Sequence, residues 1–342
     1  MTPRDPIDAV ITWVDGTTPR HRANRLHHMA QSSTPLHENA ANPHRWLNND
    51  EILYCLQSIA NHAPWTRKIW VVVDEDAPDL STLPPALRAK IHIAHHADIF
   101  AGFTDHLPTF NSLAIETMLW RIDGLAERFM YFNDDVFITA PLQPHDMFHG
   151  QTPVLRGEWV DYSALLHTPD ARADPALFNH FMQINAAQIA GYTPHHLFAA
   201  AHVVHPFLRT RMADLFERHR ATFLDNITHR FRDLSQFLPQ GLHNHASLRA
   251  GDAVISAADD HLHITSGQGN GRPANETQTL LERATDPDIK FLCINDLPQL
   301  EALIPQTRDW ITRAIGGPPR PQTATAHSHE DPKHQRAGCQ PI

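Results

Sequence analysis

The chain has 342 residues, of which 42% are hydrophobic and 19% charged, and this composition excludes a wholly disordered or collagen-like protein. Asp and Glu number 38 against 28 Lys and Arg, so a surface that coats nucleic acid is not expected. Histidine is the unusual residue, with 27 copies. Such a count points to metal sites, a pH switch or histidine catalysis.

Cysteine usage and the lack of long apolar runs indicate the compartment. Cys55, Cys293 and Cys339 are odd in number and widely spaced, so we expect no disulfide framework and a reducing compartment. The first 30 residues carry charges and no long apolar core, so we expect no signal peptide. No run reaches the roughly 18 apolar residues of a membrane span.

Strands and helices are predicted to alternate over the first 140 residues. Apolar, β-branched runs predict strands at 7–14, 68–73, 90–94, 129–132 and 136–138. Helical spacing of apolar residues predicts one helix capped by Asn49 and another capped by Asn111 or Ser112. Residues 17–44 lack periodicity and are expected to form a long loop. This order predicts an α/β fold with a mostly parallel sheet and helices on both faces.

The second half of the chain is less regular. Pro206 is expected in the first turn of a helix whose apolar stripe includes Met212 and Leu215. A late strand is predicted at 289–294, and residues 316–342 have the composition of a disordered tail. We therefore expect one domain over residues 1–315, made of two halves, 1–148 and 149–315.

The strongest local motif is Asn133-Asp134-Asp135, directly after an apolar strand. In open α/β sheets ligands bind beyond the carboxyl ends of the strands, and paired carboxylates suit a hard cation such as Mg²⁺. A solvated acidic turn is the alternative interpretation. Asp15 and Asp296 also follow predicted strands, which favours a shared site.

Two histidines and an arginine pair form weaker motifs. His202 and His205 precede Pro206, so both are expected near a helix N-terminus, where phosphate binds and a histidine could act as base or nucleophile. The alternative is one cap and one surface histidine. In the segment 229–232, Arg232 could neutralise phosphate charge, although such a pair is often a solvated basic face.

Two further histidine pairs have the spacing of zinc ligands on a strand. His243 and His245 form one pair, and His261 and His263 form the other. In a chain with 27 histidines such pairs are expected by chance, so a zinc site is the less favoured interpretation.

Several blocks together resemble one family. Residues 7–16 (IDAVITWVDG) resemble the opening block of the Stealth family of sugar-1-phosphate transferases. This family includes bacterial capsular-polysaccharide phosphotransferases and the catalytic subunit of the animal lysosomal-enzyme N-acetylglucosamine-1-phosphotransferase. Further blocks of the family, in the same order, are similar to 45–59, 61–73, 107–136, 201–211 with 229–232, and 291–296.

The resemblance implies a variant of the GT-A nucleotide-sugar transferase fold. The implied reaction moves a sugar-1-phosphate, with N-acetylhexosamine-1-phosphate favoured, from a UDP-sugar to a hydroxyl of an oligo- or polysaccharide acceptor. A phosphodiester forms and UMP is released, in capsular or exopolysaccharide synthesis. The first half would bind the nucleotide sugar, and the second would carry the catalytic His, Arg and late acid.

The resemblance also assigns roles to individual residues. Its catalytic positions fall on Glu116, Asp135, His202 and Arg232, and its late acid falls on Asp296. Asp135, Asp296 and Asp134 would hold Mg²⁺ or Mn²⁺. His202 would act as a general base or carry the phosphoryl group, and Arg232 would bind phosphate oxygens. The remaining assigned residues are Trp13, Asp15 and Gly16 at the nucleotide, with His205, Asn133 and Asn295 in supporting positions.

Two other functions stay open from the sequence. A metal-dependent GT-A glycosyltransferase with the same acids would attack the anomeric carbon and release UDP. A non-catalytic carbohydrate- or metal-binding protein would do neither. We expect a cytoplasmic protein, where nucleotide sugars are made, and contact with the inner face of the membrane stays open.

Overall fold

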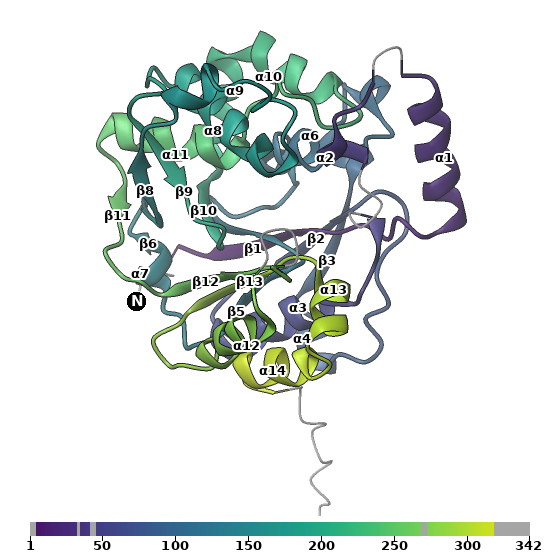
Figure 1. Ribbon diagram of the computed structural model, residues 1–342, viewed down its shortest axis with the longest axis vertical. Helices are drawn as coiled ribbons and strands as arrows, with labels where there is room; N and C mark the ends of the chain where they lie inside the picture. The colour runs from purple at the N-terminus through teal and green to yellow at the C-terminus, as the bar shows by residue number, and fades with distance from the viewer. Residues whose placement is uncertain (1–4, 33–34, 42–45, 268–271, 318–342) are drawn as a thin grey trace, which may run out of the picture.

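A five-stranded sheet forms the centre of the molecule (Figure 1). The computed structural model describes residues 5–32, 35–41, 46–267 and 272–317. In sheet order the strands are β10 (His205–Leu208), β4 (Arg128–Asn133), β1 (Ile7–Thr12), β2 (Ile69–Val73) and β3 (Ile91–His95). All neighbouring strands are parallel except β10, which pairs antiparallel with β4 at one edge. The predicted α/β class with a mostly parallel sheet is confirmed.

Helices cover both faces of this sheet, as predicted. Alternate residues of β1 enter different cores, because successive side chains of a strand point to opposite faces. Ala9 and Ile11 belong to the first core, and Val10 to the second. The first core lies under α3 (Glu51–His62), α12 (Ala274–Arg283), α13 (Leu297–Leu303) and α14 (Thr307–Ala314). The second lies under α6 (Ser112–Glu116), α8 (Phe178–Ile189), α9 (Arg209–Arg218), α10 (Arg220–Thr228) and α11 (Pro239–Ala250).

A second, three-stranded sheet lies against the first core. Its order is β12 (His261–Ile264), β13 (Phe291–Ile294) and β5 (Val136–Ile138), with β12 parallel and β5 antiparallel to β13. Because β5 follows β4 after a turn of two residues, the chain passes from the main sheet into the small one at Asp134 and Asp135. This crossing places the strongest sequence motif where the two sheets meet.

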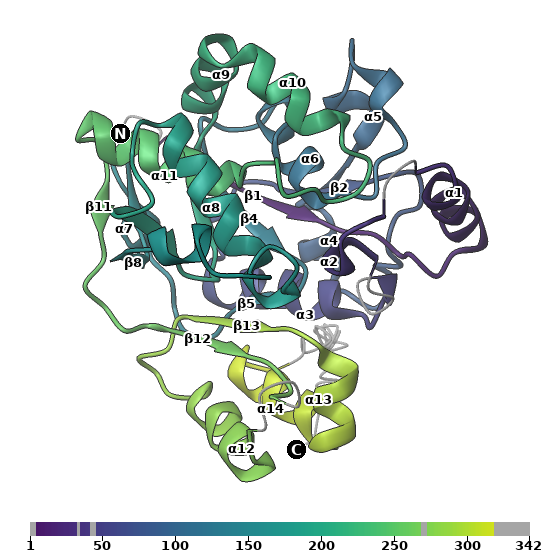
Figure 2. The ribbon, with the colours of Figure 1, turned by 45° about the horizontal axis from the view of Figure 1, so that its top comes forward.

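The other elements are short and lie around this framework (Figure 2). Two small sheets contain β6 (Phe148–His149), β7 (Thr152–Leu155), β8 (Gly157–Val160), β9 (Leu197–Ala200) and β11 (Val254–Ile255). The remaining α-helices are α1 (Pro19–Ala30), α2 (Glu38–Ala41), α4 (Pro85–Arg88), α5 (His96–Ile99) and α7 (Pro144–Met147). Within the described residues no helix is both long and apolar enough to cross a membrane.

The expectation of a loop over 17–44 is wrong for part of that segment, because α1 begins at Pro19. Pro at the first helical position is favourable, since its fixed φ suits a helix start and the missing N–H is not needed there. The helix lacks an apolar stripe because its buried side chains are His21 and Arg25. Arg25 lies over the Trp46 ring at 4.4 Å, so a cation and an aromatic ring replace the usual apolar contact.

The helix expected at Pro206 is also wrong at its start. Pro206 is in β10 and pairs with Met130 at the sheet edge, where a strand tolerates the missing N–H of proline. The helix begins three residues later at Arg209, and Met212 and Leu215 are buried as predicted.

The other predicted strands are present within one or two residues, and Asn111 caps α6 as expected. Asp50, not Asn49, is the N-cap of α3. Most of the expected tail, 318–342, lies outside the described residues.

Candidate active site

The end of β4 is held beside the end of β1 by a short hydrogen-bond chain. The Tyr131 hydroxyl donates to Oδ1 of Asn133 at 2.7 Å and lies 3.0 Å from the Thr12 hydroxyl. Thr12 and Asn133 are also register partners in the two strands. The turn of Asp134 and Asp135 therefore starts from a fixed point at the carboxyl ends of the parallel strands.

The small sheet fixes Asp135 from the other side. The backbone N–H of Ile294 donates to the carbonyl of Asp135 at 3.0 Å. The side-chain amide of Asn295 donates to Oδ2 of Asp135 at 2.5 Å, and the amide oxygen of Asn295 lies 2.5 Å from Nε2 of His263. Residues from β12 and from the end of β13 thus position one carboxylate.

His202 reaches the same place from the loop between β9 and β10. Its ring stacks on His263 with centroids 4.9 Å apart and planes 12° apart. Ligand atoms of Asp135, His202 and Cys293 all lie within 4.8 Å of one another. The turn after β4, the loop before β10 and strand β13 are far apart in the sequence, and they therefore meet at Asp135.

The two motif histidines are both held neutral at physiological pH. Burial and the neighbouring His263 lower the pKa of His202 to about 3, and burial lowers the pKa of His205 to about 4. A neutral imidazole has a lone pair that can accept a proton. The expectation that both rings lie at a helix N-terminus is wrong, because His202 is in a loop and His205 is the first residue of β10.

Arg232 and Glu116 complete the cluster. The Arg232 guanidinium donates to the Ser112 hydroxyl at 2.7 Å and to the Asn39 side chain at 3.2 Å. Burial lowers the pKa of Arg232, while the charges of Glu116 and Asp135 oppose that shift. Glu116 is buried at the end of α6, so the cation and the acids share one enclosed region. The structure therefore brings together all four residues that the resemblance assigned to catalysis.

The three acids expected to bind a cation have different environments. Burial, together with Asp135 and Glu51, raises the pKa of Asp134 and favours its protonated form. Asp296 is exposed at the residue before α13. Asp135 instead lies with an imidazole and a thiol. Mg²⁺ prefers oxygen ligands, so of these three side chains only the carboxylate of Asp135 suits Mg²⁺, and water or substrate oxygens would have to fill the other positions.

Two residues near the site, Glu51 and Cys293, were not found from the sequence, and a third, His263, was considered there only as half of a zinc pair. Glu51 begins α3, and burial followed by the charge of Asp135 raises its pKa to about 7. Cys293 and His263 are register partners in β13 and β12. Glu51 follows the predicted cap, so its acidic side chain was interpreted only as the start of a helix. The pairing of His263 with Cys293 was missed because no sequence pattern shows which residues of two strands face each other.

The expected nucleotide-binding residues lie after β1. The Asp15 carboxylate accepts hydrogen bonds from Thr17 and Asn48. Burial raises the pKa of Asp15, but these hydrogen bonds outweigh burial and hold the pKa below its usual range. A Cβ on Gly16 would lie 2.7 Å from Cβ of Trp46, so a side chain does not fit there. Trp13 is buried in the first core. Their role in nucleotide binding stays a prediction.

The histidine pairs considered for zinc have other partners. His243 and His245 lie in α11, not on a strand, and their Nε2 atoms accept the backbone N–H of Leu208 at 3.0 Å and of Phe198 at 2.9 Å. His261 lies beside Asp260, with 3.9 Å between ring nitrogen and carboxylate oxygen. Within the described part of the chain, neither pair belongs to a group of three metal-ligating side chains.

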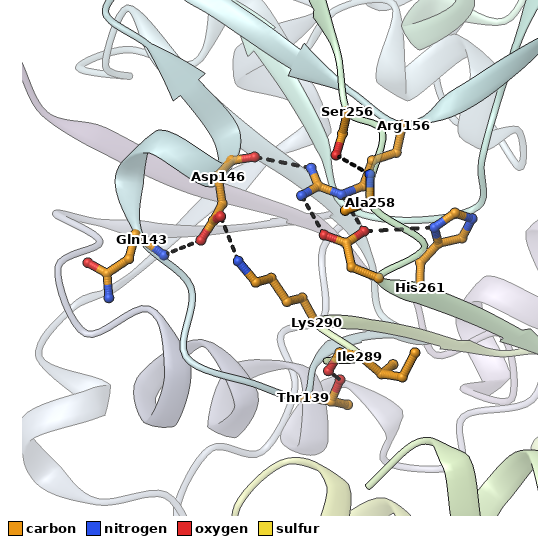
Figure 3. A network of polar contacts seen from close by, with 10 residues as sticks. Thr139, Gln143, Asp146, Arg156, Ser256, Ala258, His261, Ile289 and Lys290 are labelled. Carbon is orange, nitrogen blue, oxygen red and sulfur yellow. Dashed lines mark hydrogen bonds and ion pairs between the residues drawn. The ribbon is translucent and has the colours of Figure 1, made fainter. Parts of the chain in front are cut away.

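A separate charged network lies at the start of β13, the opposite end from Asn295 (Figure 3). Arg156 forms two hydrogen bonds of 2.8 Å with the carboxylate of Asp260, and both side chains are buried. Lys290 donates to Asp146 at 2.6 Å. These pairs join Asp146 of α7 and Arg156, the residue after β7, to the small sheet that leads to Asn295 and contains His263.

The mostly parallel α/β sheet thus has carboxylates, a histidine and an arginine together beyond the carboxyl end of β4. The chain carries the first two conserved regions of the Stealth family: Stealth protein CR1 matches residues 5–26, and Stealth protein CR2 matches residues 45–154. The predicted resemblance to this family is confirmed.

Individual relatives agree with this family. The chain is 32% identical over 321 residues to an exopolysaccharide phosphotransferase of Streptomyces coelicolor, covering 91% of this chain and 50% of the relative. It is 36% identical over 151 residues to a capsular polysaccharide phosphotransferase of Neisseria meningitidis serogroup B, covering 43% of this chain and 39% of the relative. The chain thus spans about half the length, or less, of these two relatives.

Solved structures with a similar arrangement are glycosyltransferases. The galactosyltransferase LgtC, solved with donor and acceptor sugar analogs, aligns with a TM-score of 0.44 and 12% identity over 89% of this chain and 95% of its own. WbbM, a bifunctional glycosyltransferase, aligns with a TM-score of 0.43 over 92% of this chain and 52% of its own. The likeness is one of fold and agrees with the expected GT-A type.

Proposed function

We propose that this chain transfers a sugar-1-phosphate from a UDP-sugar to a hydroxyl of a glycan acceptor, forms a phosphodiester and releases UMP. The observation that supports this is the convergence of Asp135, His202, Arg232 and Glu116 from four separate segments. The phosphotransferase names of the relatives agree with it. The donor is proposed to carry an N-acetylhexosamine, and the product to enter capsular or exopolysaccharide synthesis.

The proposed reaction uses His202 as the base. The acceptor hydroxyl oxygen attacks the phosphorus that bears the sugar, and the bond from that phosphorus to the oxygen of UMP breaks. The hydroxyl proton moves to the neutral ring of His202, which already carries a free lone pair because its pKa is about 3. Attack by His202 itself would be the two-step alternative.

Arg232 and Glu116 would act on charge and position. Phosphoryl transfer depends mainly on positioning and on neutralising the phosphate oxygens. Arg232 is half-buried beside Glu116 and Asp135, so its charge is less screened by water than a charge on the surface. We propose that the guanidinium binds oxygens of the transferred phosphoryl group and that Glu116 keeps it oriented.

A divalent cation, Mg²⁺ or Mn²⁺, is proposed at Asp135 and would supply charge neutralisation on the diphosphate when bound. Asp134 and Asp296 are the proposed supporting ligands. Trp13, Asp15 and Gly16 are proposed to lie near the nucleotide, at the carboxyl end of β1. We also propose that the chain acts in the cytoplasm, where nucleotide sugars are made.

The test is the identity of the released nucleotide. The chain would be incubated with a panel of UDP-sugars, oligosaccharide acceptors and Mg²⁺, and the nucleotides separated by chromatography. UMP that requires the acceptor and is lost in His202→Ala is the expected result. UDP would show attack at the anomeric carbon, and no nucleotide from a folded chain would indicate a binding protein; either result would overturn the proposal.

A further inference from the structure

The thiol of Cys293 lies at the proposed reaction centre although no step of the reaction uses it. Cys293 is fully buried and is the register partner of Val136, the residue after Asp135. Its sulfur, a ring nitrogen of His202 and a carboxylate oxygen of Asp135 lie within 4.8 Å of one another. Each donor comes from a different segment, so the fold itself creates the cluster.

This donor set has the chemistry of a zinc site. Zn²⁺ binds thiolate, imidazole and carboxylate in a tetrahedron, and three protein ligands leave one position for water. Mg²⁺ instead takes oxygen ligands and avoids sulfur. With the usual Zn–S and Zn–N distances, tetrahedral donors lie roughly 3–4 Å apart, so the present spacing must close by on the order of 1 Å.

The surroundings already orient two of the three donors. Asn295 donates to the carboxylate of Asp135 and is itself in contact with His263. The His263 ring stacks on His202. Such outer contacts fix the direction of metal ligands and increase affinity.

We propose that Asp135, His202 and Cys293 form a Zn²⁺ site, and that zinc bound there inhibits the enzyme. The thiol proton is released to solvent as the Zn–S bond forms. Bound zinc occupies the lone pair of His202 and the carboxylate of Asp135, so neither can serve the reaction. The inhibition rests on the proposed function, whereas the binding of zinc does not.

The binding test must separate this site from the many other histidines. Co²⁺ replaces Zn²⁺ as the probe, because a thiolate–cobalt bond gives a charge-transfer absorption that histidine ligands alone do not give. All proteins carry Cys339→Ser, which removes the thiol outside the described residues. The test variant is Cys293→Ser, and the matched control is Cys55→Ser, a second buried thiol whose sulfur lies 4.0 Å from the carbonyl of Asn133.

The expected result is a charge-transfer band with tetrahedral cobalt bands in the Cys339→Ser parent and in Cys55→Ser. Both signals should disappear on titration with Zn²⁺, and the charge-transfer band should be absent in Cys293→Ser. No band in the parent, or an equal band in Cys293→Ser, would overturn the site. Cobalt bound without the thiolate band would mean adventitious histidine ligands only.

Inhibition is measured separately, in excess Mg²⁺, relative to the uninhibited rate of each protein. The zinc concentration that halves UMP release should rise by at least about 10-fold in Cys293→Ser, since loss of even an outer contact costs about that much, and stay unchanged in Cys55→Ser. Equal sensitivity of the two would overturn inhibition through Cys293. If no UDP-sugar yields UMP, the proposed function fails while the cobalt result still decides the zinc site.

Discussion

The surroundings of His202 decide whether its ring could serve as the base of the proposed reaction. Its ring is stacked on His263, lies near Arg232 and has a pKa of about 3, so it would enter the proposed reaction neutral. An acceptor proton arriving there would place a positive charge beside Arg232. Oxygens of the transferred phosphate would offset both charges, so in the proposed reaction His202 would be a better base with the donor bound than in the free chain.

Replacing His202 by Ala should therefore reduce the rate of UMP release by about 10²–10⁴-fold, since positioned acid–base groups contribute that much. His205→Ala is the matched control, because that ring has a similar pKa shift but starts β10. It should cost less activity. Rates and thermal unfolding would be measured for both, and a larger loss at His205 in a folded protein would show that the wrong ring was chosen.

The sequence was informative about residues whose chemistry is carried by a motif. Asp135 and His202 could be named because they lie in blocks that resemble the family, and the structure brings both to one point. Cys293 could not be named, and His263 was paired with His261 instead, because the contact between Cys293 and His263 depends on the register of β12 with β13. Asp296 follows a predicted strand, yet its side chain is exposed. Strand ends are visible in a sequence, whereas side-chain direction after the strand is not.

At the scale of elements, α11 connects two strands of different sheets through its histidines. His243 accepts the backbone N–H of Leu208 in β10, and His245 accepts that of Phe198 in β9. Both rings are fully buried. Since β9 and β10 flank the loop of His202, these two bonds also hold the ends of that loop.

His243→Leu and His245→Leu should each lower the free energy of unfolding by about 1–3 kcal/mol, the usual cost of an unsatisfied buried N–H. Urea unfolding would measure the change, with the exposed His27→Leu as a control that changes it by less than about 0.5 kcal/mol. Adding a chelator should change the stability of the wild type and of all three variants by the same amount, because none of these three histidines is a proposed zinc ligand. A loss of stability with chelator that vanishes in His243→Leu would instead restore the zinc interpretation.

The buried pair of Arg156 and Asp260 is a second connection between elements (Figure 3). Arg156→Met should cost about 3–5 kcal/mol of unfolding free energy, because it leaves the Asp260 carboxylate buried and without its cation. The double variant Arg156→Met with Asp260→Leu should recover part of that loss. Urea unfolding of both singles and the double tests this, and simple addition of the two losses would contradict it.

Elements were predicted where packing follows local periodicity and missed where it does not. The strands of the main sheet are buried apolar runs, so their positions follow from the sequence. α1 buries a histidine and an arginine and has no apolar stripe to reveal it. β10 contains a proline that suits a helix start equally well, and only its pairing with β4 decides the outcome.

At the scale of the whole molecule, the 27 histidines are not one population. His96 and His243 are buried, and burial is the main cause that lowers the pKa of each to about 3. Their ordinary value of 6.5 returns when the chain unfolds. Histidines of this kind make the folded state sensitive to acid, in addition to any effect on net charge.

The sign of that effect follows from proton binding. Below pH 6.5 the unfolded chain binds a proton at His243 and the folded chain does not, so protonation favours unfolding. The stabilising contribution is full above pH 6.5 and is lost as the pH falls toward about 3. Glu51 acts in the opposite direction, because its pKa is raised to about 7 and the folded chain takes up its proton first.

The test therefore compares slopes rather than stabilities. The free energy of unfolding would be measured in urea at several pH values between 6.5 and 4.5 for the wild type, His243→Gln and the exposed control His27→Gln. His243→Gln should lose about 1.4 kcal/mol less per pH unit than the wild type, the contribution of one proton, while the control follows the wild type. Equal slopes for His243→Gln and the wild type would show that His243 is protonated in the folded protein, and the hydrogen bond from Leu208 to its neutral ring would then be wrong.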